Sequence, residues 1–166
     1  LVELYKNSSL IWAGYVLPEK YSEPYIPEPY DVSVTASDGL GILKDIPFTS
    51  NGEKTLFDVI RFCCNQTGIT LDFIVFSSLV ESSMNTGNSA LVQTSLDVST
   101  FQGKTCYEVL ESILTSLDAF ITEASGKWVI ARYTDLDKEG FLYSNSGELQ
   151  GEKAVEAREL GNVHSE

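Results

Sequence analysis

Three cysteines and one histidine are the side chains of this sequence best suited to metal binding or nucleophilic catalysis. Cys63 and Cys64 are adjacent, Cys106 lies further along, and His164 stands near the end of the chain. Adjacent cysteines lack the C-x-x-C spacing common in zinc sites, and a catalytic nucleophile needs a base beside it. We therefore expect the cysteines to pack as small buried hydrophobic residues. The sequence predicts no metal, no cofactor and no catalytic residue.

The carboxylates are numerous, but no pair of them stands out as an acid and a base. Glycoside hydrolysis would need two carboxylates facing one bond, and nothing in the sequence distinguishes such a pair from the other acids. The Asp38–Gly39 pair lacks the regular acidic spacing of a calcium-binding loop, so we interpret it as a turn. No Gly-rich phosphate-binding loop is present. The sequence predicts that the protein is not an enzyme.

Composition and charge exclude several classes of partner. The 166 residues include 24 Asp and Glu against 11 Lys and Arg, a formal net charge of −13. A nucleic-acid-binding surface needs Lys and Arg to displace counterions, and an anionic membrane repels an acidic protein. No apolar run approaches the roughly 20 residues of a membrane span. We therefore expect neither nucleic acid nor membrane as a partner. Because the chain begins at Leu1, we also expect it to be a piece of a longer protein.

The stretch from Phe101 to Asp135 predicts a helix followed by a β-hairpin. Thr105 and Glu108 have the T-x-x-E spacing of a capping box, which satisfies free backbone donors at a helix start. Apolar residues then recur at helical period and form one stripe: Cys106, Val109, Leu110, Ile113, Leu114 and Leu117. Residues 119–124 and 127–133 favour strands, and Ser125–Gly126 between them is typical of a tight turn.

A second helix is predicted over residues 54–68, fifty residues upstream of the first. Lys54–Thr55 aligns with Lys104–Thr105, and Cys63 and Cys64 align with Ile113 and Leu114. A β-prone segment follows each helix, so we interpret the two units as an internal pseudo-repeat. The fold class predicted is α+β, with mainly antiparallel strands and hairpins and two amphipathic helices in a pseudo-repeated helix–strand arrangement.

The first thirty residues predict a hairpin and a proline-rich arm. Residues 2–16 read as two strands around a polar turn, and we expect Trp12 to anchor them in the core. The arm that follows holds four of the five prolines, which fix φ and remove backbone donors, so it should be extended and irregular and run over the surface. Its tyrosines either pack down on the domain or form an interaction surface, because tyrosine has an apolar body and a polar tip. They are Tyr21, Tyr25 and Tyr30.

The remaining segments complete the predicted organisation. Residues 31–36 and 91–98 should be strands, with a polar loop over 81–90, and Leu40, Ile42, Leu43 and Ile46 should be buried. We expect one α+β module over 1–135, made of the hairpin and arm (1–30), a helix–strand unit (54–98) and a helix–hairpin unit (101–135). Residues 136–166 read as a weakly structured acidic tail, with at most one strand near Phe141–Tyr143.

Two blocks of sequence carry a resemblance to a known class of proteins. The blocks are IWAGYVLPEKY (residues 11–21) with VTASDGLGILK (34–44), and FQGKTCYEVLESIL (101–114) with GKWVIAR (126–132). In these blocks the chain resembles tail and baseplate-hub structural proteins of phages and prophages of Bacteroides and its relatives. The resemblance implies a virion-tail location, a structural role in a symmetric assembly with other tail subunits, often trimeric in hubs, and no cofactor.

Three functions from different classes follow from these observations. The leading one is a non-enzymatic structural module of a tail or baseplate-hub protein that acts through protein–protein assembly. The second is a carbohydrate- or protein-binding module of a bacterial surface protein, with Trp12 and the three arm tyrosines as contacts. The third is an enzyme, which would need a deep cleft with two converging carboxylates.

Overall fold

The computed structural model describes the chain except for residues 28, 77–78, 80–81, 137, 139 and 154–166. Its N-terminal part contains β1 (Val2–Lys6), β2 (Ser9–Val16), the short 3-10 helix η1 (Pro18–Lys20), β3 (Ala36–Ser37) and η2 (Leu40–Asp45). The middle contains β4 (Glu53–Thr55), α1 (Leu56–Asn65), β5 (Asp72–Phe76), α2 (Ala90–Gln93), β6 (Ser95–Asp97) and η3 (Val98–Phe101). The last part contains α3 (Cys106–Ser116), β7 (Phe120–Ala124), β8 (Lys127–Ala131), η4 (Tyr133–Asp135), β9 (Gly140–Tyr143) and β10 (Leu149–Lys153).

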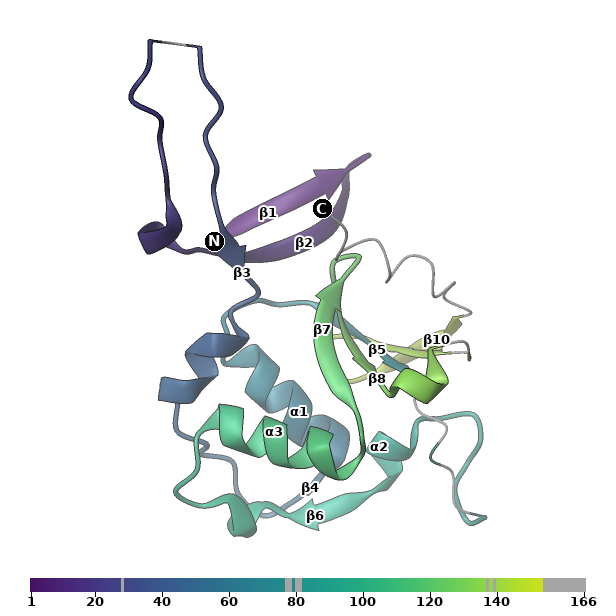
Figure 1. The fold of residues 1–166 in the computed structure, drawn as a ribbon. Helices are drawn as coiled ribbons and strands as arrows, with labels where there is room; N and C mark the ends of the chain where they lie inside the picture. The colour runs from purple at the N-terminus through teal and green to yellow at the C-terminus, as the bar shows by residue number, and fades with distance from the viewer. Residues whose placement is uncertain (28, 77–78, 80–81, 137, 139, 154–166) are drawn as a thin grey trace.

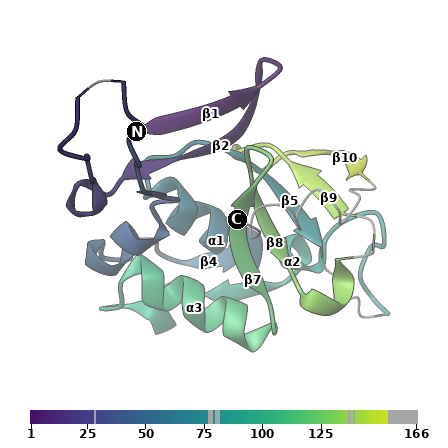
Figure 2. The same ribbon diagram turned by 45° about the horizontal axis from the view of Figure 1, so that its top comes forward.

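A five-stranded sheet covered by two helices forms the body of the protein. Its strand order is β10-β9-β5-β8-β7, and only β5 and β8 run parallel to each other. Figure 2 shows α1 and α3 side by side across one face of this sheet. Two small antiparallel sheets, β1-β2-β3 and β4-β6, lie at opposite ends of the body (Figure 1). The predicted α+β class with mainly antiparallel pairing is confirmed.

Both helices begin at the capping residues that the sequence predicts, and each buries one apolar face. The Thr55 and Thr105 side chains accept hydrogen bonds from the backbone N–H groups three residues on, and Glu108 completes the capping box of α3. The predicted apolar stripes, which include the three cysteines, are buried in one core cluster between the helices and the sheet, except that Leu117 at the end of α3 is only partly buried. The helix–sheet interface is therefore the main source of apolar burial in the body.

The predicted pseudo-repeat has a counterpart in the backbone hydrogen bonds. The N–H of Leu56, which opens α1, donates to the Thr94 carbonyl at 2.9 Å, and the N–H of Cys106, which opens α3, donates to the Ile46 carbonyl at 2.8 Å. Each helix is thus anchored at its first residue by a backbone carbonyl from outside the helix: Thr94 belongs to the same 54–98 unit as α1, and Ile46 precedes both units. The two helix starts are therefore held by the same kind of hydrogen bond, but from segments at different places in the chain.

The hairpin β7–β8 is present with the tight turn that its sequence predicts. Ser125 and Gly126 both have positive φ, 52° and 67°, which suits a two-residue hairpin turn. A β-carbon at Gly126 would collide with the Leu10 carbonyl oxygen, because β2 passes directly over this turn. On the helix side of the sheet, Trp128 is fully buried. Trp128, and not the predicted Trp12, is therefore the core tryptophan; Trp12 is half-buried, and its ring covers Gly14.

Three local predictions are wrong. Residues 90–93 form a turn of helix, because the Ser89 hydroxyl caps it, and only 95–97 are a strand. Within 31–36 only Ala36 belongs to a strand, because the rest of that segment is one limb of the projecting arm. Ile42 is 42% exposed, since η2 turns it away from the core that buries Leu43.

The weak structure predicted beyond Tyr143 is also wrong for residues 149–153, because they form β10, whereas β9 is the one strand that the sequence allowed near Phe141–Tyr143. β9 pairs with β5 in the main sheet and β10 pairs with β9. Tyr143 is only 1% exposed, and its hydroxyl accepts a hydrogen bond from the Ser89 N–H at 3.0 Å. A neighbouring strand far away in sequence thus orders a segment that has little apolar periodicity of its own. Residues 154–166, including His164, lie outside the described residues.

Candidate interaction surface

The proline-rich arm projects from the body between β2 and β3. Its two limbs are joined at the base, where the Leu17 N–H donates to the Thr35 carbonyl at 2.8 Å. A single isolated bridge between Ser22 and Ser33 ties them further out. Figure 1 shows the arm extending away from the five-stranded sheet and from α1 and α3. The expectation that the arm runs over the surface is therefore wrong: its prolines prevent a continuous ladder, and its limbs contact each other rather than the body.

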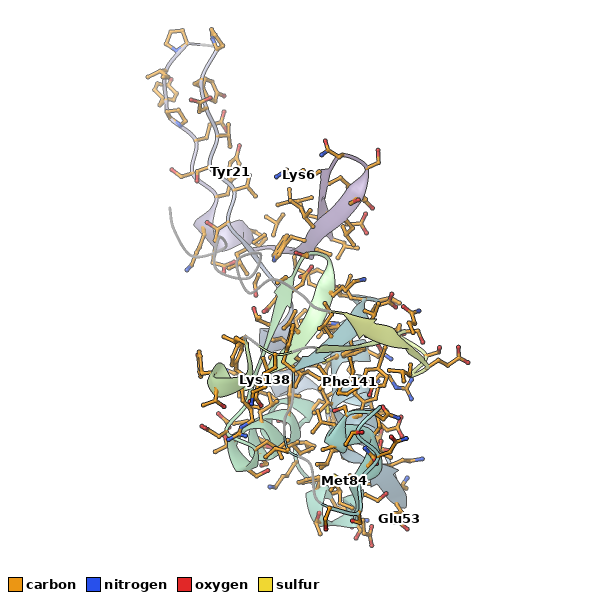
Figure 3. The ribbon with its side chains drawn as sticks, turned by 90° about the vertical axis from the view of Figure 1, so that its right-hand side faces the viewer. Lys6, Tyr21, Glu53, Met84, Lys138 and Phe141 are labelled. Carbon is orange, nitrogen blue, oxygen red and sulfur yellow. The ribbon has the colours of Figure 1, made fainter. Side chains whose placement is uncertain are left out.

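A cluster of two tyrosines and one carboxylate organises the middle of the arm. Glu23 accepts hydrogen bonds from the Tyr21 hydroxyl, at 3.1 Å, and from the Tyr30 hydroxyl. The two donors lower the pKa of Glu23, and the same bonds raise the pKa of both tyrosines. Glu23 therefore stays ionised and Tyr21 and Tyr30 stay neutral over the physiological pH range. Figure 3 shows Tyr21 on the arm, well separated from α1, α3 and the five-stranded sheet.

The outer part of the arm is apolar and exposed. Tyr25 is fully exposed, and the neighbouring Ile26 is 58% exposed. With prolines and Glu23 they line an open hollow of about 530 Å³, whose walls are Glu23, Pro24, Tyr25, Ile26, Pro27 and Tyr30. Of the three predicted tyrosines, Tyr21 and Tyr25 are exposed and Tyr30 is half-buried. Exposure on this scale disagrees with a strap that packs onto its own domain.

Exposed apolar side chains occur on the N-terminal hairpin as well as on the arm. Among the described residues, ten of the thirteen large apolar side chains that are exposed fall within residues 1–34. They are Leu1, Leu4, Tyr5, Ile11, Val16, Tyr21, Tyr25, Ile26, Val32 and Val34. We call this set the N-terminal surface. Contiguous exposed apolar area on a folded protein marks sites of association.

Sequence reasoning missed the hairpin's share of the N-terminal surface. Leu4, Tyr5 and Ile11 look like ordinary strand residues, and their alternation does not show which strand face is covered. β1 is the edge strand of its sheet, and β3, at the other edge, is only two residues long. A short sheet without a helix packed over it leaves apolar residues in water, and only the assembled fold reveals that.

The three cysteines are not part of the N-terminal surface but are buried in the core cluster of the body. Burial raises the pKa of Cys63, Cys64 and Cys106, so all three remain protonated thiols near neutral pH. Cys106 directs its thiol toward the Pro47 carbonyl oxygen at 3.8 Å. No group of three or more His, Cys, Asp or Glu side chains suited to a metal ion occurs within the ranges that the structure describes.

Comparisons with known proteins add no family assignment. The chain matches no protein-family model, no curated protein and no solved structure. Within the part of the chain that the structure covers, no helix has the length and apolar character needed to cross a bilayer.

Proposed function

We propose that this chain is a non-enzymatic structural module of a phage or prophage tail or baseplate-hub protein. It acts in protein–protein assembly in the virion tail, with other tail or baseplate subunits as partners and a homotrimer as the assembled form of the full-length protein. The helix–sheet body supplies a rigid base, and the N-terminal surface supplies the contacts. The observation that carries the proposal is the concentration of exposed apolar side chains within residues 1–34.

The physical properties of the N-terminal surface suit assembly. Tyrosine and isoleucine side chains bury large areas on association, and an edge strand such as β1 presents free backbone groups to a neighbouring chain. The acidic net charge of −13 opposes non-specific clumping, so association must come from specific apolar contacts. The resemblance in residues 11–44 and 101–132 supplies the tail context.

Mutation within a phage that encodes the protein tests this function. Ile26→Ser removes an apolar side chain that is 58% exposed on the arm, and Ile42→Ser removes one that is 42% exposed on η2, outside the N-terminal surface. We expect Ile26→Ser to reduce complete tails seen by electron microscopy and Ile42→Ser to leave them unchanged. Equal tail counts for both variants, or purified virions that lack the protein by mass spectrometry, would contradict the proposal.

A carbohydrate-binding module is the second candidate, and the arm hollow is the observation that favours it. Aromatic rings beside a carboxylate suit stacking and hydrogen bonding to a sugar, and the hollow brings Tyr25 and Tyr30 beside Glu23. A glycan array probed with the purified chain separates the two functions. Specific glycan binding that disappears in Tyr25→Ser would favour the carbohydrate-binding module.

A further inference from the structure

Three hydrogen bonds and the apolar contacts of Leu10, Ala13 and Tyr15 with the core cluster hold the N-terminal hairpin on the body. The Gly126 N–H in the β7–β8 turn donates to the Ile11 carbonyl at 2.9 Å. Two residues further along β2, the Ala13 N–H donates to the Glu123 carboxylate Oε1 at 2.6 Å. At the far end of β2, the Tyr15 hydroxyl donates to the Thr67 carbonyl at 2.8 Å. Figure 1 shows β2 crossing the end of β7 at this junction.

Glu123 is a buried carboxylate at the centre of this junction. Its residue is only 3% exposed, and its second oxygen, Oε2, has no hydrogen-bond partner among the described residues. Its cross-strand neighbour in β8 is Trp128, whose indole nitrogen is also without a partner in the same described set. A buried carboxylate with one bonded oxygen is costly to ionise, because the lost hydration is not replaced.

The charged groups around Glu123 give it no compensation. Asp38, in the turn after β3, adds a repulsive negative charge. Glu3 lies opposite Ala13 in β1 and is a further acid, which accepts a hydrogen bond from Tyr5. Lys127 neighbours Trp128 in β8, but alternation places it on the other sheet face, where it pairs with Asp72 at 3.8 Å.

We propose that Glu123 is a proton-controlled clasp that sets how firmly the N-terminal hairpin docks on the body. The protonated carboxyl group still accepts the Ala13 N–H and carries no charge into the junction. Ionisation places an uncompensated charge between β2 and β7, beside Asp38. The clasp would control the orientation of the N-terminal surface relative to the helices and sheet. It does not depend on the tail role proposed above.

The direction of the pH effect follows from linkage. Burial, reinforced by Asp38 and opposed by the Ala13 hydrogen bond, raises the pKa of Glu123 from 4.5 to about 7. In the undocked state the carboxylate meets water and ionises near its ordinary pKa. The docked state therefore holds a proton that the undocked state has lost between those two values. Docking is strongest below pH 4.5, weakens as the pH rises toward 7, and changes little above that.

Hydrogen exchange at single amides tests the clasp. After correction for intrinsic exchange, we expect the protection of the Ala13 amide to fall on the order of a hundred-fold between pH 5 and pH 8. The Val75 amide, in the centre of the five-stranded sheet, reports global unfolding and should stay far better protected than Ala13 at both pH values, because undocking opens only the junction. Equal protection of Ala13 and Val75 would mean that Ala13 exchanges only through global unfolding, and it would overturn the proposal.

Two variants and one titration complete the test. Glu123→Gln keeps an oxygen acceptor for Ala13 and removes the charge, so Ala13 protection should become independent of pH. Glu111→Gln removes an exposed acid on α3 and should retain the wild-type pH dependence. An NMR titration of the Glu123 carboxyl carbon in the wild-type protein should show a midpoint near 7. A midpoint near 4.5, or an unchanged pH dependence in Glu123→Gln, would overturn the clasp.

Discussion

Truncation of Leu110 to alanine measures how much the packing of α3 on the body contributes to stability. Leu110 is 4% exposed and belongs to the same core cluster as Val59 and Ile60 of α1. The backbone of α3 is fixed at its first residue by the hydrogen bond from Cys106 to Ile46, so the helix cannot easily move inward to fill a cavity. We therefore expect Leu110→Ala to lower the free energy of unfolding by an amount in the middle of the range known for Leu→Ala changes in protein cores.

That range is about 2–5 kcal/mol, and we expect about 3 kcal/mol for Leu110→Ala. Urea denaturation followed by tryptophan fluorescence reports the change, because Trp128 is fully buried in the same cluster. With a denaturant slope of about 2 kcal/mol per molar urea, the midpoint should fall by about 1.5 M. The slope itself should stay constant, since the surface exposed on unfolding changes little.

Ile42→Ala is the matched control, because it truncates an aliphatic side chain that is 42% exposed on η2. We expect its cost to stay below about 1 kcal/mol. If Leu110→Ala costs less than about 0.5 kcal/mol, or no more than Ile42→Ala, the reasoning about the helix–sheet core is refuted.

Three further predictions follow from capping, burial and exposure. Thr105→Ala removes the hydroxyl that caps α3 and should cost about 1 kcal/mol in urea denaturation, whereas Thr105→Ser should cost far less; equal losses would contradict the capping role. The thiols of Cys63, Cys64 and Cys106 should react with a thiol reagent at pH 8 only after unfolding, because burial raises their pKa; rapid labelling of any one in the native protein would show it to be accessible. Tyr25→Ala should change the free energy of unfolding by less than about 0.5 kcal/mol, because the side chain is fully exposed; a larger loss would show that the arm packs on the body.

The sequence by itself determined the elements whose signals are local. The capping box at Thr105, the apolar stripe behind it and the Ser125–Gly126 turn each depend on residues within a few positions of one another. Helix periodicity and turn chemistry act over that distance, so they can be read without knowing the rest of the fold. The predicted fifty-residue offset between the two helices is also found, since α1 begins at Leu56 and α3 at Cys106. This offset could be predicted because it compares two local patterns.

The candidate surface was only partly predictable from the sequence. The arm tyrosines Tyr21, Tyr25 and Tyr30 stand out by composition, but composition does not distinguish a strap from a projection. The structure shows a projection, because the two limbs of the arm pair with each other at the Ser22–Ser33 bridge and Tyr25 is exposed to solvent. The sequence does not indicate that Leu4 and Ile11 belong to the N-terminal surface, since their exposure depends on which segments pack against them.

Only the tertiary structure decided the features that depend on distant partners. Tyr143 is buried because β9 pairs with β5 in the main sheet. Trp128, and not Trp12, is the core tryptophan because α1 and α3 cover its face of the sheet. Glu123 gains its unusual environment from β2, which lies 110 residues away in the sequence. Burial and desolvation are properties of a surface and its neighbours in space, so no local pattern of residue types can specify them.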